Sequence, residues 1–242
     1  MHPKLFTLKI PISEYNYNLT DERIAKYPLE RRDESKLLVY KKGEIISSGF
    51  KSIDTFLPEN GLLVFNETRV IQARLLFKKN TGADIEIFCL EPLDPADYYQ
   101  AFQVKTSCKW KCLVGNLKKW KDGTVELKLN NGIDNVDLIA EKIAHHGEWQ
   151  EIKFTWTPEN LSFGDILEMA GQTPIPPYLN RKSEEIDKSR YQTIYSINNG
   201  SVAAPTAGLH FTPQVFEKIE NKNIECIGLT LHVGAGTFRP VK

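Results

Sequence analysis

The hydrophobic and polar positions between about residues 75 and 156 alternate with a period of two. Residues 124–129 (Thr-Val-Glu-Leu-Lys-Leu) are the clearest example, and turn signals such as Asp122-Gly123 and His146-Gly147 recur at short intervals. Alternating runs between tight turns are typical of antiparallel strands with one buried face. This part of the chain therefore predicts an all-β domain, most simply a small barrel.

On both sides of that segment the pattern is mixed. Residues 62–65 and 224–231 are apolar runs typical of buried strands, whereas residues 212–221 have a capped helical pattern. We therefore expect a mixed α/β fold. We expect two domains. The α/β domain has a barrel-like or open sheet and is discontinuous, made of residues 1–74 and 157–242. The second is a small β-barrel domain, residues 75–156, inserted between these two parts.

Two further segments, residues 202–212 and 229–241, share one pattern: an apolar run leads to a hydroxyl, glycines and a histidine. Small residues at a strand end allow the backbone to approach a ligand closely. Since a helix separates the two segments, we expect a strand, helix, strand unit with parallel strands, whose ends surround one pocket. The candidate residues are Thr206, Gly208, His210, His232, Gly234, Gly236 and Thr237.

A polar cluster follows the predicted strand at residues 62–65. Asn66, Thr68 and Arg69 have side chains that can donate hydrogen bonds to a carboxylate, a ribose or a phosphate. We therefore include them among the candidate binding residues.

Composition sets broad limits on the class of protein. Hydrophobic residues make up 41% and charged residues 26% of the 242 positions, as in globular proteins, and no apolar run is long enough to cross a bilayer. We expect a cytoplasmic protein with no membrane partner. The four cysteines have no paired spacing typical of zinc ligands, so we expect reduced thiols and no metal site.

Net charge gives no sign of nucleic-acid binding, because 31 basic residues balance 31 acidic ones. Residues 98–121, however, contain no acidic residue and interleave lysines with Trp110 and Trp120. Cations beside aromatic rings are suited to RNA. Equally, lysines protect a sheet edge from aggregation while tryptophans fill a core. Both interpretations remain open for Lys105, Lys109, Lys111, Lys118 and Lys119.

Residues 204–211 (Ala-Pro-Thr-Ala-Gly-Leu-His-Phe) and 231–238 (Leu-His-Val-Gly-Ala-Gly-Thr-Phe) resemble signatures of the S-adenosylmethionine:tRNA ribosyltransferase-isomerase family. The resemblance continues through residues 61–75 and covers nearly the whole chain. Family members usually carry Asp or Asn where Glu67 stands and Pro where Gln72 stands. These departures concern loop geometry more than chemistry.

The resemblance implies transfer and isomerisation of the ribosyl moiety of S-adenosylmethionine onto 7-aminomethyl-7-deazaguanine at the tRNA wobble position. The product is epoxyqueuosine-tRNA, and adenine and methionine are released. S-adenosylmethionine would be a consumed substrate, with no cofactor, and the precursor tRNA the partner. The sequence leaves the oligomeric state open, with a monomer favoured for the full-length enzyme.

Such a reaction needs a base, an acid or hydrogen-bond donor for adenine, and groups that hold the methionine carboxylate. An imidazole titrates near working pH, so His210 or His232 is the candidate for proton transfer. A structural role is the alternative for each histidine. Arg69 or Arg239 would bind a carboxylate or phosphate.

Two rival functions belong to other classes. A non-catalytic tRNA-binding fragment of such an enzyme is one. A methyltransferase is disfavoured, because no Gly-rich loop follows the first strand. Family chains also continue beyond the string at residues 237–241, with Gly-Thr-Thr-Ser and Asn-Phe-His stretches that do not occur here. We therefore expect the 242-residue chain alone to be weakly active or inactive, and prone to self-associate.

Overall fold

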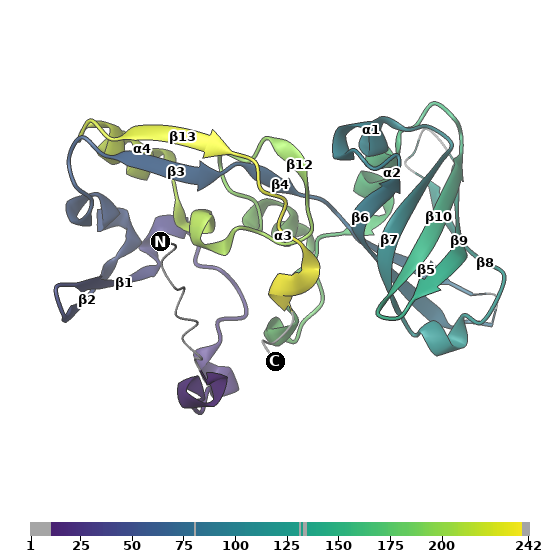
Figure 1. Cartoon of the computed structure of the whole chain (residues 1–242), viewed down its shortest axis with the longest axis horizontal. Helices are drawn as coiled ribbons and strands as arrows, with labels where there is room; N and C mark the ends of the chain where they lie inside the picture. Colours follow the sequence, from purple (N-terminus) through teal and green to yellow (C-terminus); the bar gives the residue numbers. More distant parts are fainter. Residues whose placement is uncertain (1–10, 80, 131, 133–134, 239–242) are drawn as a thin grey trace, which may run out of the picture.

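The computed structural model describes residues 11–79, 81–130, 132 and 135–238. Figure 1 shows an elongated molecule with a large antiparallel sheet at one end, two parallel strand pairs in the middle and a β-hairpin at the other end. The fold is mixed α/β, as the sequence pattern predicts.

The helices are short, and most of the secondary structure is β. The α-helices are α1 (Tyr98–Gln103), α2 (Phe163–Ala170), α3 (Glu185–Arg190) and α4 (Pro213–Glu220). The strands are β1 (Lys36–Lys41), β2 (Glu44–Gly49), β3 (Leu62–Asn66), β4 (Thr68–Val70), β5 (Arg74–Lys78), β6 (Asp84–Asp94), β7 (Ser107–Gly115), β8 (Thr124–Asn130), β9 (Asn135–His146), β10 (Trp149–Thr157), β11 (Gly171–Gln172), β12 (Asn198–Ser201) and β13 (Glu225–Leu229).

The large sheet has seven strands in the order β11-β5-β6-β7-β10-β9-β8, and its described pairs are antiparallel. Buried and less buried positions alternate along β7 and β10, which confirms the period of two in the sequence. The sheet curls into a half-barrel around a core that includes Trp110, Trp120, Phe77 and Phe154, all with no exposed surface. The two tryptophans are therefore core residues, and the interpretation that they stack on RNA bases is wrong.

The middle of the molecule is built on residues 62–70. Strand β13 pairs in parallel with β3, and β12 pairs in parallel with β4. The two strands that flank α4 thus run in the predicted common direction, but each pairs with a different part of residues 62–70 and not with the other. Helix α4 begins where predicted, because the Thr212 hydroxyl accepts a hydrogen bond from Val215 N at 3.3 Å.

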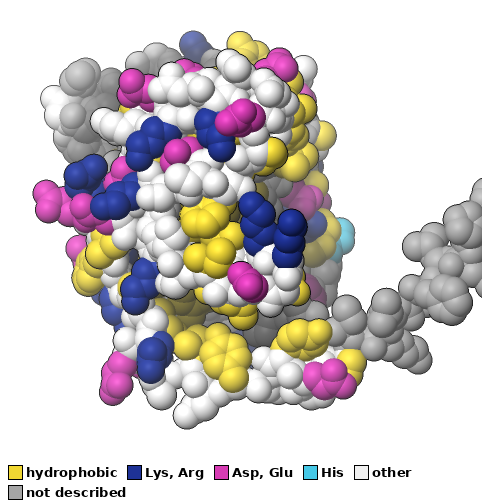
Figure 2. All heavy atoms as spheres, turned by 90° about the vertical axis from the view of Figure 1, so that its left-hand side faces the viewer, with side chains coloured by type: hydrophobic (Ala, Val, Ile, Leu, Met, Phe, Trp, Pro, Cys, Tyr) yellow, Lys and Arg dark blue, Asp and Glu magenta, His cyan; other side chains and the backbone are white. Residues whose placement is uncertain are grey.

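Two strand pairs leave apolar side chains exposed. The exposed side chains on the β1–β2 pair are Leu38, Tyr40 and Ile45, and those on the β3–β13 pair are Leu62, Val64, Ile227 and Leu229. Figure 2 views the molecule from the hairpin end and shows hydrophobic side chains gathered between charged ones on that face. Within the described residues, no helix combines the length and the apolar character that a membrane crossing requires.

Candidate active site

The two segments that follow β12 and β13 meet in space. Val202 N donates a hydrogen bond to Val233 O at 3.0 Å, and Val233 N donates to the Ser201 hydroxyl at 2.7 Å. Thr206 and Thr237 also border one small cavity of about 130 Å³, together with Tyr178 and Tyr191. The two segments therefore converge as the sequence predicts. Backbone groups of Val202 and Val233 and the Ser201 hydroxyl form these hydrogen bonds, and the candidate site residues do not.

His232 lies beside this junction and has a defined partner. Its Nδ1 is 3.1 Å from the Thr68 hydroxyl, which is 2.8 Å from the Ser201 hydroxyl. The imidazole also contacts the Tyr98 ring, with centroids 4.4 Å apart. Tyr98 belongs to α1, beside the large sheet, so two distant parts of the chain hold this ring (Figure 1).

Partial burial lowers the pKa of His232, because a desolvated imidazole is harder to charge. The ring also lies directly against Gly200, which has a φ of +153°. A Cβ at Gly200 would approach the imidazole Cε1 to 2.3 Å. Only glycine suits this position, both for its backbone conformation and for the space that His232 occupies.

A cavity of about 510 Å³ opens at His232. Its wall combines aromatic rings with amide and hydroxyl groups, from Tyr98, Tyr99, Asn198, Asn199, Thr230 and Phe102. Aromatic rings with a few polar groups are typical of a site for a small organic ligand.

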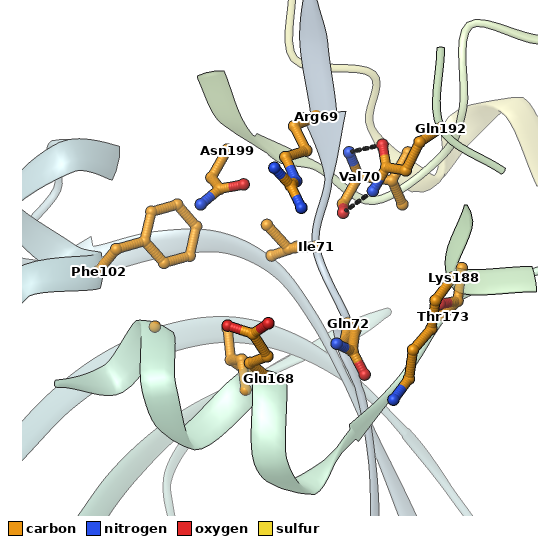
Figure 3. A pocket seen from close by; sticks show the side chains of 12 residues that line it. Arg69, Val70, Ile71, Gln72, Phe102, Glu168, Thr173, Lys188, Gln192 and Asn199 are labelled. Atoms are coloured by element: carbon orange, nitrogen blue, oxygen red, sulfur yellow. Dashed lines mark hydrogen bonds between the residues drawn. The ribbon is translucent and has the colours of Figure 1, made fainter. Parts of the chain in front are cut away.

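A second cavity of about 290 Å³ adjoins the first, since Phe102 and Asn199 border both. Figure 3 shows Arg69 and Asn199 entering it from one side and Glu168 from the other. Gln192 holds β4 at this cavity through two hydrogen bonds. Val70 N donates to Gln192 Oε1 at 2.9 Å, and Gln192 Nε2 donates to Val70 O at 2.6 Å (Figure 3).

A family model described as queuosine biosynthesis protein matches residues 12–242. The chain belongs to this family. Curated relatives named S-adenosylmethionine:tRNA ribosyltransferase-isomerase are 42% identical over 235 residues in Trichlorobacter lovleyi and 40% identical over 233 residues in Syntrophomonas wolfei. Each alignment covers 96% of this chain, but 62% and 61% of the respective relative. The queuosine-family chain thus spans about three fifths of the length of these relatives.

A crystal structure of S-adenosylmethionine tRNA ribosyltransferase from Thermotoga maritima is 27% identical, with a TM-score of 0.33. That match covers 91% of this chain and 58% of the solved one.

In this queuosine-family chain, His210 lies apart from His232. Its ring packs against Phe50, with centroids 5.3 Å apart, and it borders neither of the two adjoining cavities. Its neighbour Gly208 is buried, and a Cβ there would lie 2.2 Å from the Tyr195 hydroxyl. This geometry favours the structural alternative for His210.

Asn66 connects the end of β3 to the segment that follows β13. Its Nδ2 donates to Leu231 O at 2.8 Å, and its Oδ1 accepts from Leu231 N and Thr68 N. Glu67, where the family usually has Asp or Asn, accepts hydrogen bonds from Asn198 Nδ2 and the Thr230 hydroxyl, both at 3.2 Å. Both side chains therefore connect β3 to the loops that form the larger cavity.

Gly234 and Gly236 lie on a different surface. They border a cavity of about 260 Å³ with Lys111 and Trp149, and a Cβ at either glycine would meet nothing within 4 Å. Space therefore does not require glycine at either position. Arg239, the other candidate for a carboxylate or phosphate, lies outside the described residues.

The candidate RNA-binding lysines divide into two groups. Lys109 pairs with Glu151 at 3.3 Å, and Lys111 pairs with Glu91 at 3.2 Å. Lys105, Lys118 and Lys119 are exposed and have no ion pair among the described residues. Acidic residues from neighbouring strands thus compensate part of a stretch that contains none of its own.

Sequence reasoning missed three residues at the site: Tyr98, Ser201 and Glu168. Each is distant along the chain from the motif it meets, and no local pattern marks it. In the part of the chain that the structure describes, no group of three or more His, Cys, Asp or Glu residues is arranged to hold a metal ion.

Proposed function

We propose that this chain carries the S-adenosylmethionine-binding and catalytic part of a tRNA ribosyltransferase-isomerase. The reaction would move the ribosyl moiety of S-adenosylmethionine to 7-aminomethyl-7-deazaguanine at the tRNA wobble position, releasing adenine and methionine. It would form epoxyqueuosine-tRNA in the cytoplasm, with S-adenosylmethionine consumed and no separate cofactor. Support comes from the family match over residues 12–242 and from the names of the curated relatives.

The single observation that carries the site is the position of His232. It is an imidazole beside a 510 Å³ cavity, in hydrogen-bond contact with Thr68 on β4, whose hydroxyl in turn contacts Ser201 at the end of β12. His210 lacks these features, so we assign proton transfer to His232. Thr68 and Asn66 would then be positioning residues.

The hydrogen bonds favour one tautomer of His232. The Ser201 hydroxyl accepts from Val233 N, which leaves its own proton for Thr68. Thr68 would in turn donate to His232 Nδ1 at 3.1 Å in preference to Asn198 O, which is 3.5 Å away. A neutral imidazole that accepts at Nδ1 carries its proton on Nε2. His232 would then donate a hydrogen bond to the departing adenine.

The curled sheet is the proposed tRNA-binding part. Its strands β5 to β10 lie within residues 74–157, and we propose that residues 75–156 are an inserted domain. Lys105, Lys118 and Lys119 would contact phosphates, since neighbouring carboxylates do not neutralise them.

Release of adenine tests the proposal. The chain is incubated with S-adenosylmethionine and tRNA that carries the 7-aminomethyl-7-deazaguanine base, and free adenine is measured in a single turnover. We expect slow release of adenine from the unmodified chain, a loss of about tenfold or more in His232→Asn, and a smaller loss in His210→Asn. Binding of tRNA without any adenine would instead support a non-catalytic tRNA-binding fragment.

A further inference from the structure

The 290 Å³ cavity between β4 and α2 contains two opposite charges. Figure 3 shows Arg69, from β4, and Glu168, from α2, pointing into it from opposite sides. Within the described residues, neither side chain forms an ion pair or a hydrogen bond with another side chain. Both residues are exposed, and a cation and an anion that face one cavity without an ion pair suit a ligand with both charges.

The two walls of this cavity are held firmly. Gln192 binds both backbone groups of Val70, next to Arg69. On the other wall, Gly171 follows α2 and packs so closely that a Cβ would lie 1.9 Å from Gln72 O. The distance between strand and helix is therefore set before any ligand enters, which lowers the entropic cost of binding.

The charge balance distinguishes between classes of ligand. The third charged residue at the cavity, Lys188, already pairs with Glu185 at 3.0 Å, which leaves one cation and one anion. A phosphate would be repelled by Glu168, and a simple amine by Arg69. Gln72 also lines this cavity, and its buried Oε1 receives no hydrogen bond. The cavity therefore also offers an acceptor for an N–H group of a ligand.

We propose that this cavity binds the α-amino-acid end of S-adenosylmethionine, with its carboxylate on Arg69 and its ammonium group on Glu168. The inference rests on the proposed function and adds a binding site to it. Phe102 and Asn199 border both cavities, so a ligand held here by its amino-acid end extends toward His232 with its sulfonium and nucleoside. The volume of about 290 Å³ lies at the lower limit for small-molecule pockets and suits one end of such a ligand.

Calorimetric titration with two nucleosides tests this site. S-adenosylmethionine has the amino-acid end, whereas 5′-methylthioadenosine keeps the adenosine and the sulfur but lacks it. Arg69→Met and Glu168→Gln should each weaken S-adenosylmethionine binding about tenfold or more and change methylthioadenosine binding less than about twofold, since each removes one charge-assisted hydrogen bond. Glu217→Gln, at an exposed position on α4 away from the cavity, is the matched control and should change neither affinity.

Several results would overturn the proposal: equal weakening of both nucleosides by the two variants, no weakening of either, or an unmodified chain that binds neither. Failure of the proposed function is a different result. If the unmodified chain binds S-adenosylmethionine but releases no adenine with precursor tRNA, the transferase assignment fails, while the titration still decides what the cavity binds.

Discussion

His232 shows how single residues set the chemistry of this site. Its Nδ1 faces the Thr68 hydroxyl and its ring lies between Tyr98 and Gly200. The hydrogen bond that one ring nitrogen of a neutral imidazole makes decides which nitrogen carries the proton. The glycine decides how closely the backbone approaches the ring. The consequences can be measured at three positions.

Thr68→Val should change the tautomer of His232. The substitution keeps the side-chain shape but removes the hydroxyl that we propose donates to Nδ1, so the preference for a proton on Nε2 should weaken. Nitrogen-15 chemical shifts of the imidazole above pH 7.5 measure this, and the signals of exposed His146 serve as the control. Unchanged His232 shifts would show that Thr68 does not set the tautomer.

Gly200→Ala should displace His232 and lower the rate of adenine release about tenfold or more, because the new methyl group would overlap the imidazole. The matched control is Gly49→Ala, where a Cβ would have only an ordinary contact with Lys51 at 3.8 Å and φ is −98°. Full activity in Gly200→Ala would contradict the described position of the ring.

The lowered pKa of His232 also predicts a dependence of stability on pH. The unfolded chain takes up a proton at this histidine at a higher pH than the folded chain does, so folded stability falls as pH drops through the ordinary imidazole pKa. Melting temperatures at pH 7.5 and 5.5 should therefore differ more in the unmodified chain than in His232→Asn. An equal difference would show that the pKa of His232 is the same in both states.

At the scale of elements, the sequence predicts what depends on local pattern. The period of two in residues 124–129 and the cap at Thr212 are confirmed. Residues 62–65 form the predicted strand, but the prediction that it is buried is wrong: Leu63 packs against the core, whereas Leu62 and Val64 are exposed, because β3 belongs to a two-stranded sheet. Contacts between distant elements are not predictable in this way. No pattern near residue 98 indicates that α1 brings Tyr98 to His232, and none near residue 168 places Glu168 opposite Arg69.

The lysine-rich stretch shows the same limit. Its interpretation depends on cross-strand neighbours that the stretch itself does not contain. Strand pairing places Glu151 opposite Lys111 and its carboxylate 3.3 Å from Lys109, and the same pairing buries Trp110. The curled core, not base stacking, accounts for the tryptophans.

Lysines without ion pairs should account for most of the electrostatic binding of tRNA. Replacing both Lys118 and Lys119 by Gln should weaken binding and reduce the dependence of log affinity on log salt concentration by about one to two units of slope. The control is Lys109→Gln, which should change the slope little because Glu151 already compensates that charge. If the unmodified chain, the double variant and Lys109→Gln all show the same slope, Lys118 and Lys119 do not contact RNA phosphates.

At the scale of the whole molecule, the apolar core lies mainly inside the curled sheet, whereas the parallel strand pairs are thinly covered. β3 and β13 form a two-stranded sheet, and both strands have exposed apolar side chains. Exposed apolar groups beside open strand edges favour association between copies.

Self-association should therefore increase with concentration and weaken when this face becomes polar. The double variant Ile227→Thr, Leu229→Thr keeps the β propensity of β13 while removing exposed apolar surface. Sedimentation velocity over a range of concentrations compares it with the unmodified chain. Identical monomeric sedimentation of both proteins would contradict the prediction.

The contact between Tyr98 and His232 has a consequence for how such proteins can diverge. Tyr98 comes from α1, beside the curled sheet, and His232 comes from the segment after β13. Neither part of the chain alone therefore determines the surroundings of the imidazole. A chimera that exchanges residues 75–156 for the equivalent block of a relative inherits a foreign neighbour for His232. Grafting of that block should succeed only where the donor also supplies a ring at position 98.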